Sequence, residues 1–231
     1  MAEVALAPLG LVLVTVWLML PAYLANTIAS IVGGGPPIDD GRNWNDGRRI
    51  LGDGKTWRGL IGGTLGGLLV GHLQMTAGAG FFSGYVSWGS SPYLIFFLLA
   101  FGALVGDMAA SFIKRRQGQE RGTKSPLLDM YDFIIGALVL TGLFGGGWLN
   151  HWLFGGWISH GWVPLITLII ATPILHRSVN ILGIDSVFYP AERRAAIWER
   201  LATQLPLAKI DAICSEAGLA DLPQLGKDIL E

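Results

Sequence analysis

The chain has few charged residues and a single cysteine, and both shortages restrict what it can be. Only 14% of its 231 residues are charged, whereas soluble domains carry about 25%. A net charge of −1 lacks the basic excess of nucleic-acid-binding proteins, so we expect no nucleic-acid partner. The single cysteine, Cys214, excludes an internal disulfide framework. A cleaved signal peptide is not expected, because the first ten residues lack a basic stretch.

Apolar residues, by contrast, are abundant and lie in long runs. Hydrophobic residues make up 52% of the chain, and its mean hydropathy is +0.50. A helix needs roughly 20 apolar residues to cross a bilayer. We therefore predict an all-α integral membrane protein with five transmembrane helices. The predicted spans cover residues 4–32, 58–74, 93–114, 131–154 and 161–183, of which the second is short and rich in glycine.

Basic residues are distributed unequally among the loops of this five-span arrangement. Loops 34–57 and 115–130 each hold four Lys or Arg residues, whereas loops 75–92 and 150–162 hold none. Cytoplasmic loops carry the Lys and Arg excess, which predicts an N-terminus outside and a C-terminus in the cytoplasm. The outer loops instead contain tryptophans, which we expect to be interfacial anchors: Trp88, Trp148, Trp152, Trp157 and Trp162.

Two domains follow from the change in composition near residue 185. Residues 1–185 form the predicted five-helix membrane domain. Residues 186–231 contain no spanning run and form a predicted short helical tail in the cytoplasm, where Ile197, Leu201 and Leu205 recur at helical spacing.

The loop before the second span combines glycines with basic residues between Gly47 and Gly59. It does not fit the phosphate-binding G-x-x-x-x-G-K-[ST] motif, because Arg49 occupies the position of the first glycine. Glycines still permit close approach of a ligand to the backbone, and Arg48, Lys55 and Arg58 can donate to phosphate oxygens. The alternative is that these basic residues only set topology and contact lipid head groups.

A second group of polar residues ends the third span. Asp107, Ser111 and Lys114 share one helical face at i, i+4 and i+7, and Arg115 follows at the water boundary. The alternative interpretation is that the basic residues snorkel to the membrane surface and that Asp107 forms an interhelical salt bridge. A carboxylate within a membrane span is costly, which favours a function for Asp107.

A third group opens the fourth span, where Ser125 and Pro126 mark a helix start. Asp129 and Asp132 then lie one turn apart on one face. Asp129 could simply complement the helix dipole, but that does not account for Asp132, which leads into an apolar run. Together with Asp107, the two carboxylates form a candidate site for Mg²⁺, which prefers oxygen ligands and substrate phosphates.

Several of these segments resemble the archaeal CDP-archaeol synthases, which are integral membrane cytidylyltransferases. The resemblance covers about residues 20–185 and is most specific in the block from Asp46 to Gly59. It also rests on the segments Pro21–Asn26, Pro37–Asp39, Gly106–Asp107, Ser111–Arg115 and Pro126–Phe133. The second half is similar to the bacterial CDP-diacylglycerol synthases as well, although Met130 stands where their D-R-x-D signature has arginine.

The resemblance implies an enzyme that condenses CTP with 2,3-bis-O-geranylgeranylglycerol 1-phosphate, giving CDP-archaeol and pyrophosphate at the cytoplasmic side of the cell membrane. It implies Mg²⁺ as the cofactor, with CTP, the lipid phosphate and the bilayer as partners. The expected metal ligands are Asp107, Asp129 and Asp132, which form the catalytic set together with Lys114. The expected substrate-binding residues are Arg48, Asp53, Lys55, Thr56, Arg58, Ser111 and Arg115. The alternative function is an ion-coupled transporter, which would need polar groups reaching the outer half.

Overall fold

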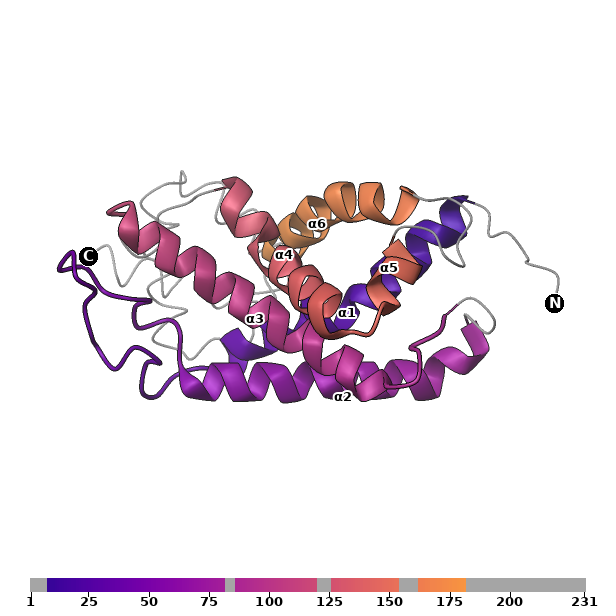
Figure 1. Ribbon diagram of the computed structural model, residues 1–231, viewed down its shortest axis with the longest axis horizontal. Coiled ribbons are helices and arrows are strands. Elements are labelled where there is room, and N and C mark those ends of the chain that lie inside the picture. The colour runs from indigo at the N-terminus through magenta and orange to yellow at the C-terminus, as the bar shows by residue number, and fades with distance from the viewer. Residues whose placement is uncertain (1–7, 82–85, 120–125, 154–161, 182–231) are drawn as a thin grey trace, which may run out of the picture. The chain divides into compact units, whose positions relative to one another are not determined.

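Each predicted apolar segment contains a helix in the computed structural model, which describes residues 8–81, 86–119, 126–153 and 162–181. The helices are α1 (Pro8–Val32), α2 (Trp57–Phe81), α3 (Pro92–Arg116), α4 (Pro126–Phe144), α5 (Trp148–Leu153) and α6 (Val163–Ile181) (Figure 1). Within these ranges there is no strand, only two isolated bridges in the loop between α1 and α2. The all-α prediction is confirmed for the described residues, and the predicted tail 186–231 lies outside them.

The structure bears out part of the five-span prediction. Two described helices are long and apolar enough to cross a membrane, at Leu9–Val32 and Pro92–Arg116. Crossing by the other helices, and the direction of the chain, remain predictions. The second predicted span is not short, because α2 extends over 25 residues.

The prediction of one continuous helix over 131–154 is wrong. The chain breaks between α4 and α5, where Gly146 and Gly147 adopt φ of 60° and 83°, a region that glycine alone enters readily. The short helix α5 then turns its tryptophans inward. Trp148 and Trp152 are 7% and 0% exposed, and Trp148 stacks on Trp88 at 5.8 Å between ring centroids. These tryptophans are therefore core residues, not the interfacial anchors that were expected.

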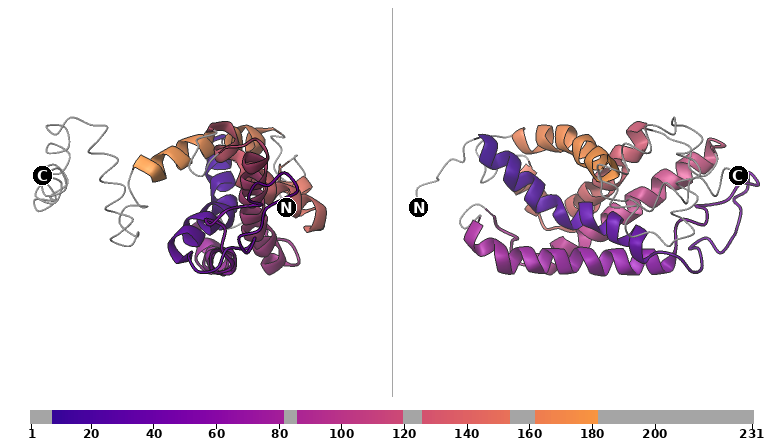
Figure 2. Two further views of the ribbon diagram at one scale, coloured as in Figure 1. Left: turned by 90° about the vertical axis from the view of Figure 1, so that its left-hand side faces the viewer. Right: turned by 180° about the vertical axis from the view of Figure 1, so that it is seen from behind.

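Glycines on one face of α2 allow it to pack closely between α1 and α3, which lie beside it in Figures 1 and 2. Gly63 contacts the backbone and side chains of α1 and Leu104 of α3, and Gly71 lies against the ring of Phe96. A Cβ added at Gly67 would lie 2.3 Å from the Cβ of Ala100 and 2.9 Å from the Pro21 carbonyl oxygen. Small residues that bring backbones together are a common basis of helix association in membranes.

Gly67→Ala is therefore expected to destabilise the bundle by about 1–3 kcal/mol, because neither neighbouring atom belongs to a flexible side chain. Thermal unfolding in detergent should show a Tm lowered by several degrees. Ala77→Leu, on an exposed part of α2, adds more volume and should leave the Tm nearly unchanged. An unchanged Tm for Gly67→Ala would contradict the tight α2–α3 contact.

Two prolines leave helix carbonyls without their usual donor, and side chains of other helices replace it. Pro21 cannot donate to the Trp17 carbonyl four residues earlier, and the Gln74 amide of α2 donates to that oxygen instead. Pro173 likewise frees the Ile169 carbonyl, which accepts from the Tyr131 hydroxyl at 2.7 Å. Prolines are tolerated in apolar helices where such substitutes exist. These bonds tie α1 to α2 and α6 to α4.

Gln74→Leu is expected to cost about 1–3 kcal/mol, because it removes the donor that Gln74 supplies to the partly buried Trp17 carbonyl. The same substitution should cost much less in a Pro21→Ala background, where a backbone N–H is restored to the helix. The coupling can be measured as a double-mutant cycle of unfolding free energies in detergent. Equal costs in both backgrounds would show that the Trp17 carbonyl does not depend on Gln74.

Helices α3 and α4 approach each other most closely through three glycines. A Cβ at Gly106 would come within 2.2 Å of the Asp132 carbonyl oxygen, and one at Gly136 within 2.3 Å of the Gly102 carbonyl oxygen. This contact sets Asp132 of α4 beside the turn of α3 that carries Asp107. The glycines thus bring together two of the acids that the sequence singled out.

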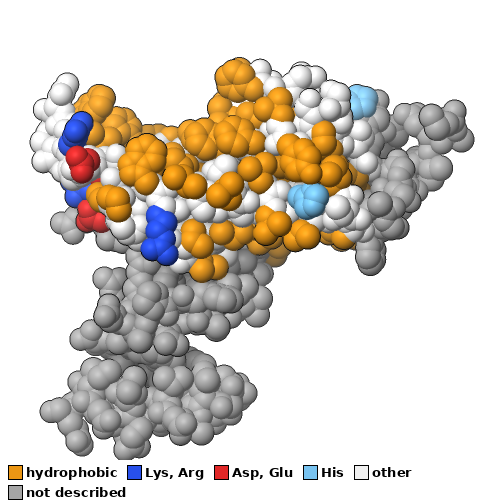
Figure 3. Space-filling model, turned by 90° about the horizontal axis from the view of Figure 1, so that it is seen from below, with side chains coloured by type: hydrophobic (Ala, Val, Ile, Leu, Met, Phe, Trp, Pro, Cys, Tyr) orange, Lys and Arg blue, Asp and Glu red, His pale blue; other side chains and the backbone are white. Residues whose placement is uncertain are grey.

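Charged and apolar side chains separate on the surface of the described helices. Figure 3 shows one face of the molecule, where Lys, Arg, Asp and Glu gather toward one end of the described part and hydrophobic side chains cover much of the rest. On α2, Ile61, Leu65, Leu69 and Leu73 recur at every fourth residue and are all exposed. Such a stripe suits contact with lipid chains, whereas charges in the bilayer core are costly.

Candidate active site

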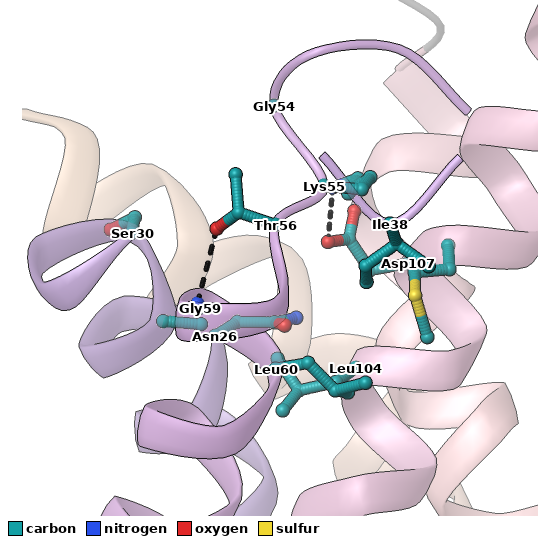
Figure 4. A pocket seen from close by; sticks show the side chains of 12 residues that line it. Asn26, Ser30, Ile38, Gly54, Lys55, Thr56, Gly59, Leu60, Leu104 and Asp107 are labelled. Carbon is teal, nitrogen blue, oxygen red and sulfur yellow. Dashed lines mark hydrogen bonds and ion pairs between the residues drawn. The ribbon is translucent and has the colours of Figure 1, made fainter. Parts of the chain in front are cut away.

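A pocket opens at the charged end of the helices, between the end of α1, the loop 33–56, the start of α2 and the middle of α3. Figure 4 shows polar side chains from α1, the loop and α3 around it. Asn26 and Ser30 come from α1, Lys55 and Thr56 from the loop, and Asp107 from α3. Apolar side chains complete the lining: Ile38, Leu60, Leu104 and Met108.

Lys55 and Asp107 form an ion pair that joins the loop to α3 across this pocket. Their side chains are 23% and 32% exposed, so the pair is partly shielded from water and open to a ligand. Both residues were predicted site residues, 52 positions apart in the sequence. The structure brings them into direct contact.

Lys114 and Asp129 form a second ion pair of the same kind, between the end of α3 and the first turn of α4. Asp132 lies within electrostatic range of Asp107, Lys55 and Lys114. Three acids and two lysines therefore share one charged region, and their predicted roles in catalysis and metal binding stay predictions. Each lysine neutralises one carboxylate, and either member of a pair could exchange its partner for an oppositely charged ligand.

The three aspartates do not form a ready metal centre as they stand. Within the described ranges, no three His, Cys, Asp or Glu side chains are close enough together to hold one ion. Lysines engage the carboxylates of Asp107 and Asp129. Carboxylate oxygens remain the right donors for Mg²⁺, so the residues fit the ion chemically once the lysines have moved to another anion. The metal assignment stays a prediction.

Thr56 begins α2. Its hydroxyl accepts a hydrogen bond from the Gly59 amide at 3.1 Å, and the residue is 5% exposed. This is the bond of a helix N-cap. Thr56 therefore has a structural role in the pocket wall, in addition to the contact with CTP that the sequence predicts. Arg58, the second residue of α2, is exposed, and its side chain makes no hydrogen bond or ion pair with the described residues. Ser111 is half-buried on α3.

The loop 33–56 is organised around the buried carboxylate of Asp39, whose side chain is 0% exposed. Arg49 donates to both carboxylate oxygens, at 2.8 and 3.2 Å, and the backbone amides of Leu51, Gly52 and Gly41 donate as well. Burial opposes ionisation of Asp39, but these hydrogen bonds outweigh it and hold its pKa well below the usual range. The hydrogen bonds to Asp39 in turn raise the pKa of Arg49.

Three other predicted binding residues have partners within the protein. Arg48 is exposed and donates to the Arg116 carbonyl oxygen at 2.6 Å. Arg115 donates to the Gln119 carbonyl oxygen at 2.7 Å, just beyond its own helix. Asp53 pairs with Arg49 at 2.8 Å and its side chain is 63% exposed. The structure does not place Arg48, Arg115 or Asp53 in the pocket lining.

Sequence reasoning missed three residues that matter to this region: Asn26, Asp39 and Arg116. The carboxamide oxygen of Asn26 is buried in the pocket wall without a hydrogen-bond partner among the described residues. Its signal was a polar residue within the apolar run of the first span. Asp39 and Arg116 gave no such signal, because each stands beside other residues of the same charge.

Comparison with known proteins agrees with this architecture. A family model described as CarS-like, CDP-archaeol synthase, matches residues 9–189. A CDP-archaeol synthase of Methanospirillum hungatei is 51% identical over 168 residues, covering 71% of this chain and 94% of the relative. One from Archaeoglobus fulgidus is 44% identical over 179 residues, covering 76% and 94%. A solved structure of an intramembrane enzyme for archaeal membrane lipid biosynthesis is 37% identical, with a TM-score of 0.58, and covers 74% of this chain and 94% of that one.

Long apolar helices, with a pocket in which Lys55 pairs with Asp107, define a helical membrane protein. The family-model match over residues 9–189, together with relatives at 44–51% identity, identifies the family within this class. The chain belongs to the CDP-archaeol synthase family. The resemblance drawn from the sequence motifs is confirmed.

Proposed function

We propose that the protein is a membrane cytidylyltransferase that joins CTP to 2,3-bis-O-geranylgeranylglycerol 1-phosphate, giving CDP-archaeol and pyrophosphate. Family membership supports the reaction. The observation that carries it is the pocket where the Gly54–Thr56 turn meets Asp107 of α3. A transporter, the alternative function, has no support from the family.

In this reaction an oxygen of the lipid phosphate attacks the α-phosphorus of CTP. A new P–O bond forms, the bond to the β-phosphate oxygen breaks, and pyrophosphate leaves with its electron pair. Phosphoryl-type transfer depends mainly on positioning and charge stabilisation. Lys55 and Lys114 are suited to this task, because each ammonium is now neutralised by one carboxylate and can move to a phosphate oxygen of the substrate.

Asp107, Asp129 and Asp132 are the residues that would hold Mg²⁺ when their lysines turn to the triphosphate. The ion would supply positive charge against the polyphosphate. This exchange keeps the charge of the region balanced, since lysine and carboxylate each gain an opposite partner. Arg58 is exposed at the pocket edge of α2 and is available as a further donor to phosphate.

The site faces the cytoplasm in our proposal, and the chain crosses the membrane five times. The loop 33–56 and the end of α3 support this orientation, because they carry basic residues and contact each other through Arg48 and Arg116. Both segments must then lie on the same side of the membrane. The lipid phosphate would enter sideways from the inner leaflet, with its chains between the helices.

The test is the release of pyrophosphate from CTP by the purified protein in detergent, on addition of the lipid phosphate. We expect release that needs both substrates and Mg²⁺, together with a CDP-lipid product seen by mass spectrometry. The other nucleoside triphosphates serve as matched controls. Absence of a CDP-lipid from protein that is folded and monodisperse would refute the proposal.

A further inference from the structure

The end of α3 contacts the middle of the loop 33–56, mainly through the side chain of Arg116. Its guanidinium donates to the Asp46 carboxylate at 2.6 Å and to the carbonyl oxygens of Arg48 and Arg49 at 3.1 and 2.5 Å. It also lies over the Phe112 ring, 5.0 Å from the centroid. An isolated exposed ion pair contributes little, but one guanidinium that satisfies three acceptors and stacks on a ring is fixed in place.

A side chain of the loop also donates a hydrogen bond to the end of α3. Arg48 donates to the carbonyl oxygen of Arg116, one of those that the end of α3 leaves without a helical donor. Gly118 leaves room for the Arg48 guanidinium, since a Cβ there would lie 3.1 Å from its nitrogen. Trp44 of the loop packs edge-on against Phe112, with ring centroids 5.4 Å apart. Loop and helix end are thus joined by polar and aromatic contacts in both directions.

This junction has a clear relation to the pocket. The loop touches α3 at a second place, where Lys55 pairs with Asp107. Substrate phosphate would break that pair under the proposed function, because Lys55 must leave Asp107. The Arg116 contacts lie away from the pocket lining and would remain when Lys55 moves.

We propose that Arg116 is a positioning residue that holds the loop 33–56 against α3 so that Lys55 stays over the pocket while it exchanges Asp107 for CTP. The inference rests on the proposed function for its kinetic consequence. Arg116 itself needs no contact with the substrate. Its loss is expected to weaken CTP binding more than it slows the chemical step.

The test compares Arg116→Ala and Arg116→Lys with Arg42→Ala. Arg42→Ala removes the same charge from an exposed position of the same loop, where the guanidinium lies 3.8 Å from the exposed Asp40 carboxylate. We expect Arg116→Ala to raise KM for CTP by about tenfold with kcat changed less than about threefold. Arg116→Lys should show most of this effect, since one ammonium cannot reach three acceptors. Arg42→Ala should change either constant less than about twofold.

Limited trypsin digestion gives a readout that does not need activity. Cleavage after Arg42, Arg48 and Arg49 should be faster in both Arg116 variants than in wild type, with the Tm little changed. If Arg116→Ala does not fold, Arg116→Lys carries the test. Unchanged KM, or a fall in kcat without a change in KM, or unchanged cleavage would overturn the inference. Absence of cytidylyl transfer by wild type would instead defeat the proposed function, and the cleavage rates would still judge the Arg116 contact.

Discussion

Asp107→Asn is expected to lower kcat by at least about 100-fold, the scale seen when one pre-positioned electrostatic group is removed from an active site. Asp107 is the carboxylate that meets Lys55 in the pocket, and it is the proposed contact of Mg²⁺ as well. The amide keeps the shape of the side chain but carries no charge. Without the charge the side chain can neither form the ion pair with Lys55 nor serve as a strong ligand of Mg²⁺, whereas packing against α2 should be little altered.

The measurement is the steady-state rate of CDP-lipid formation by protein in detergent, with size-exclusion profile and Tm as checks on folding. Asp40→Asn is the matched control, because Asp40 is an exposed loop carboxylate with a side chain that is 78% exposed. It should keep its activity. Asp107→Asn protein that folds and retains normal turnover would refute both the Lys55–Asp107 site and the metal assignment.

Asp39→Asn is expected to loosen the loop 33–56 and to reduce kcat/KM for CTP by about tenfold or more, because hydrogen bonds to a charged group contribute about 1.5–3 kcal/mol each. Asn offers one acceptor oxygen, and its NH₂ group would face donors of Arg49 or of the Leu51 and Gly52 amides. Gly52 adopts φ of 99° and its amide donates to this carboxylate. The turn that leads to Lys55 is therefore expected to depend on Asp39.

Hydrogen exchange of the Leu51 and Gly52 amides measures the effect directly. Their protection should fall in Asp39→Asn and persist in Asp40→Asn, which changes the neighbouring exposed carboxylate in the same way. Normal protection in Asp39→Asn would show that the buried carboxylate does not hold the turn.

The pH dependence of the loop follows from the same residue. The folded pKa of Asp39 lies well below its unfolded value, so its contribution to stability is complete above the unfolded pKa of about 3.9. It is lost only as the pH falls through the lowered folded pKa. Protection of the Leu51 and Gly52 amides in wild type should therefore show no titration of Asp39 between about pH 5 and about pH 8. A titration in that range would show that Asp39 is not held ionised by Arg49.

Much of the site could be predicted because membrane burial makes charge conspicuous. Asp107 and Asp132 lie next to apolar runs, and a charge there is costly unless it has a partner or a function. Lys55 was marked by the glycines around it. The pattern also predicted helices at all five apolar segments, since a long apolar run in this kind of chain has few alternatives to helix.

The partners of these residues could not be predicted in the same way. Asp39 lies beside Asp40 in the sequence, and nothing local indicates that one is buried while the other is exposed. Arg115 and Arg116 are equally adjacent, yet Arg115 turns back to Gln119 while Arg116 reaches the loop. The break between α4 and α5 was hidden because glycine within an apolar run also occurs in continuous membrane helices.

The sequence by itself determined the class of protein, most of its helices, its family and the charged residues to which our proposal assigns the chemistry. All of these follow from composition, hydrophobic runs and contiguous motifs. Only the tertiary structure decided that Lys55 meets Asp107, that Lys114 meets Asp129, and that Arg116 contacts the loop. Such pairs join residues 15 to 70 positions apart, and their contact depends on how closely glycine lets α2, α3 and α4 approach one another.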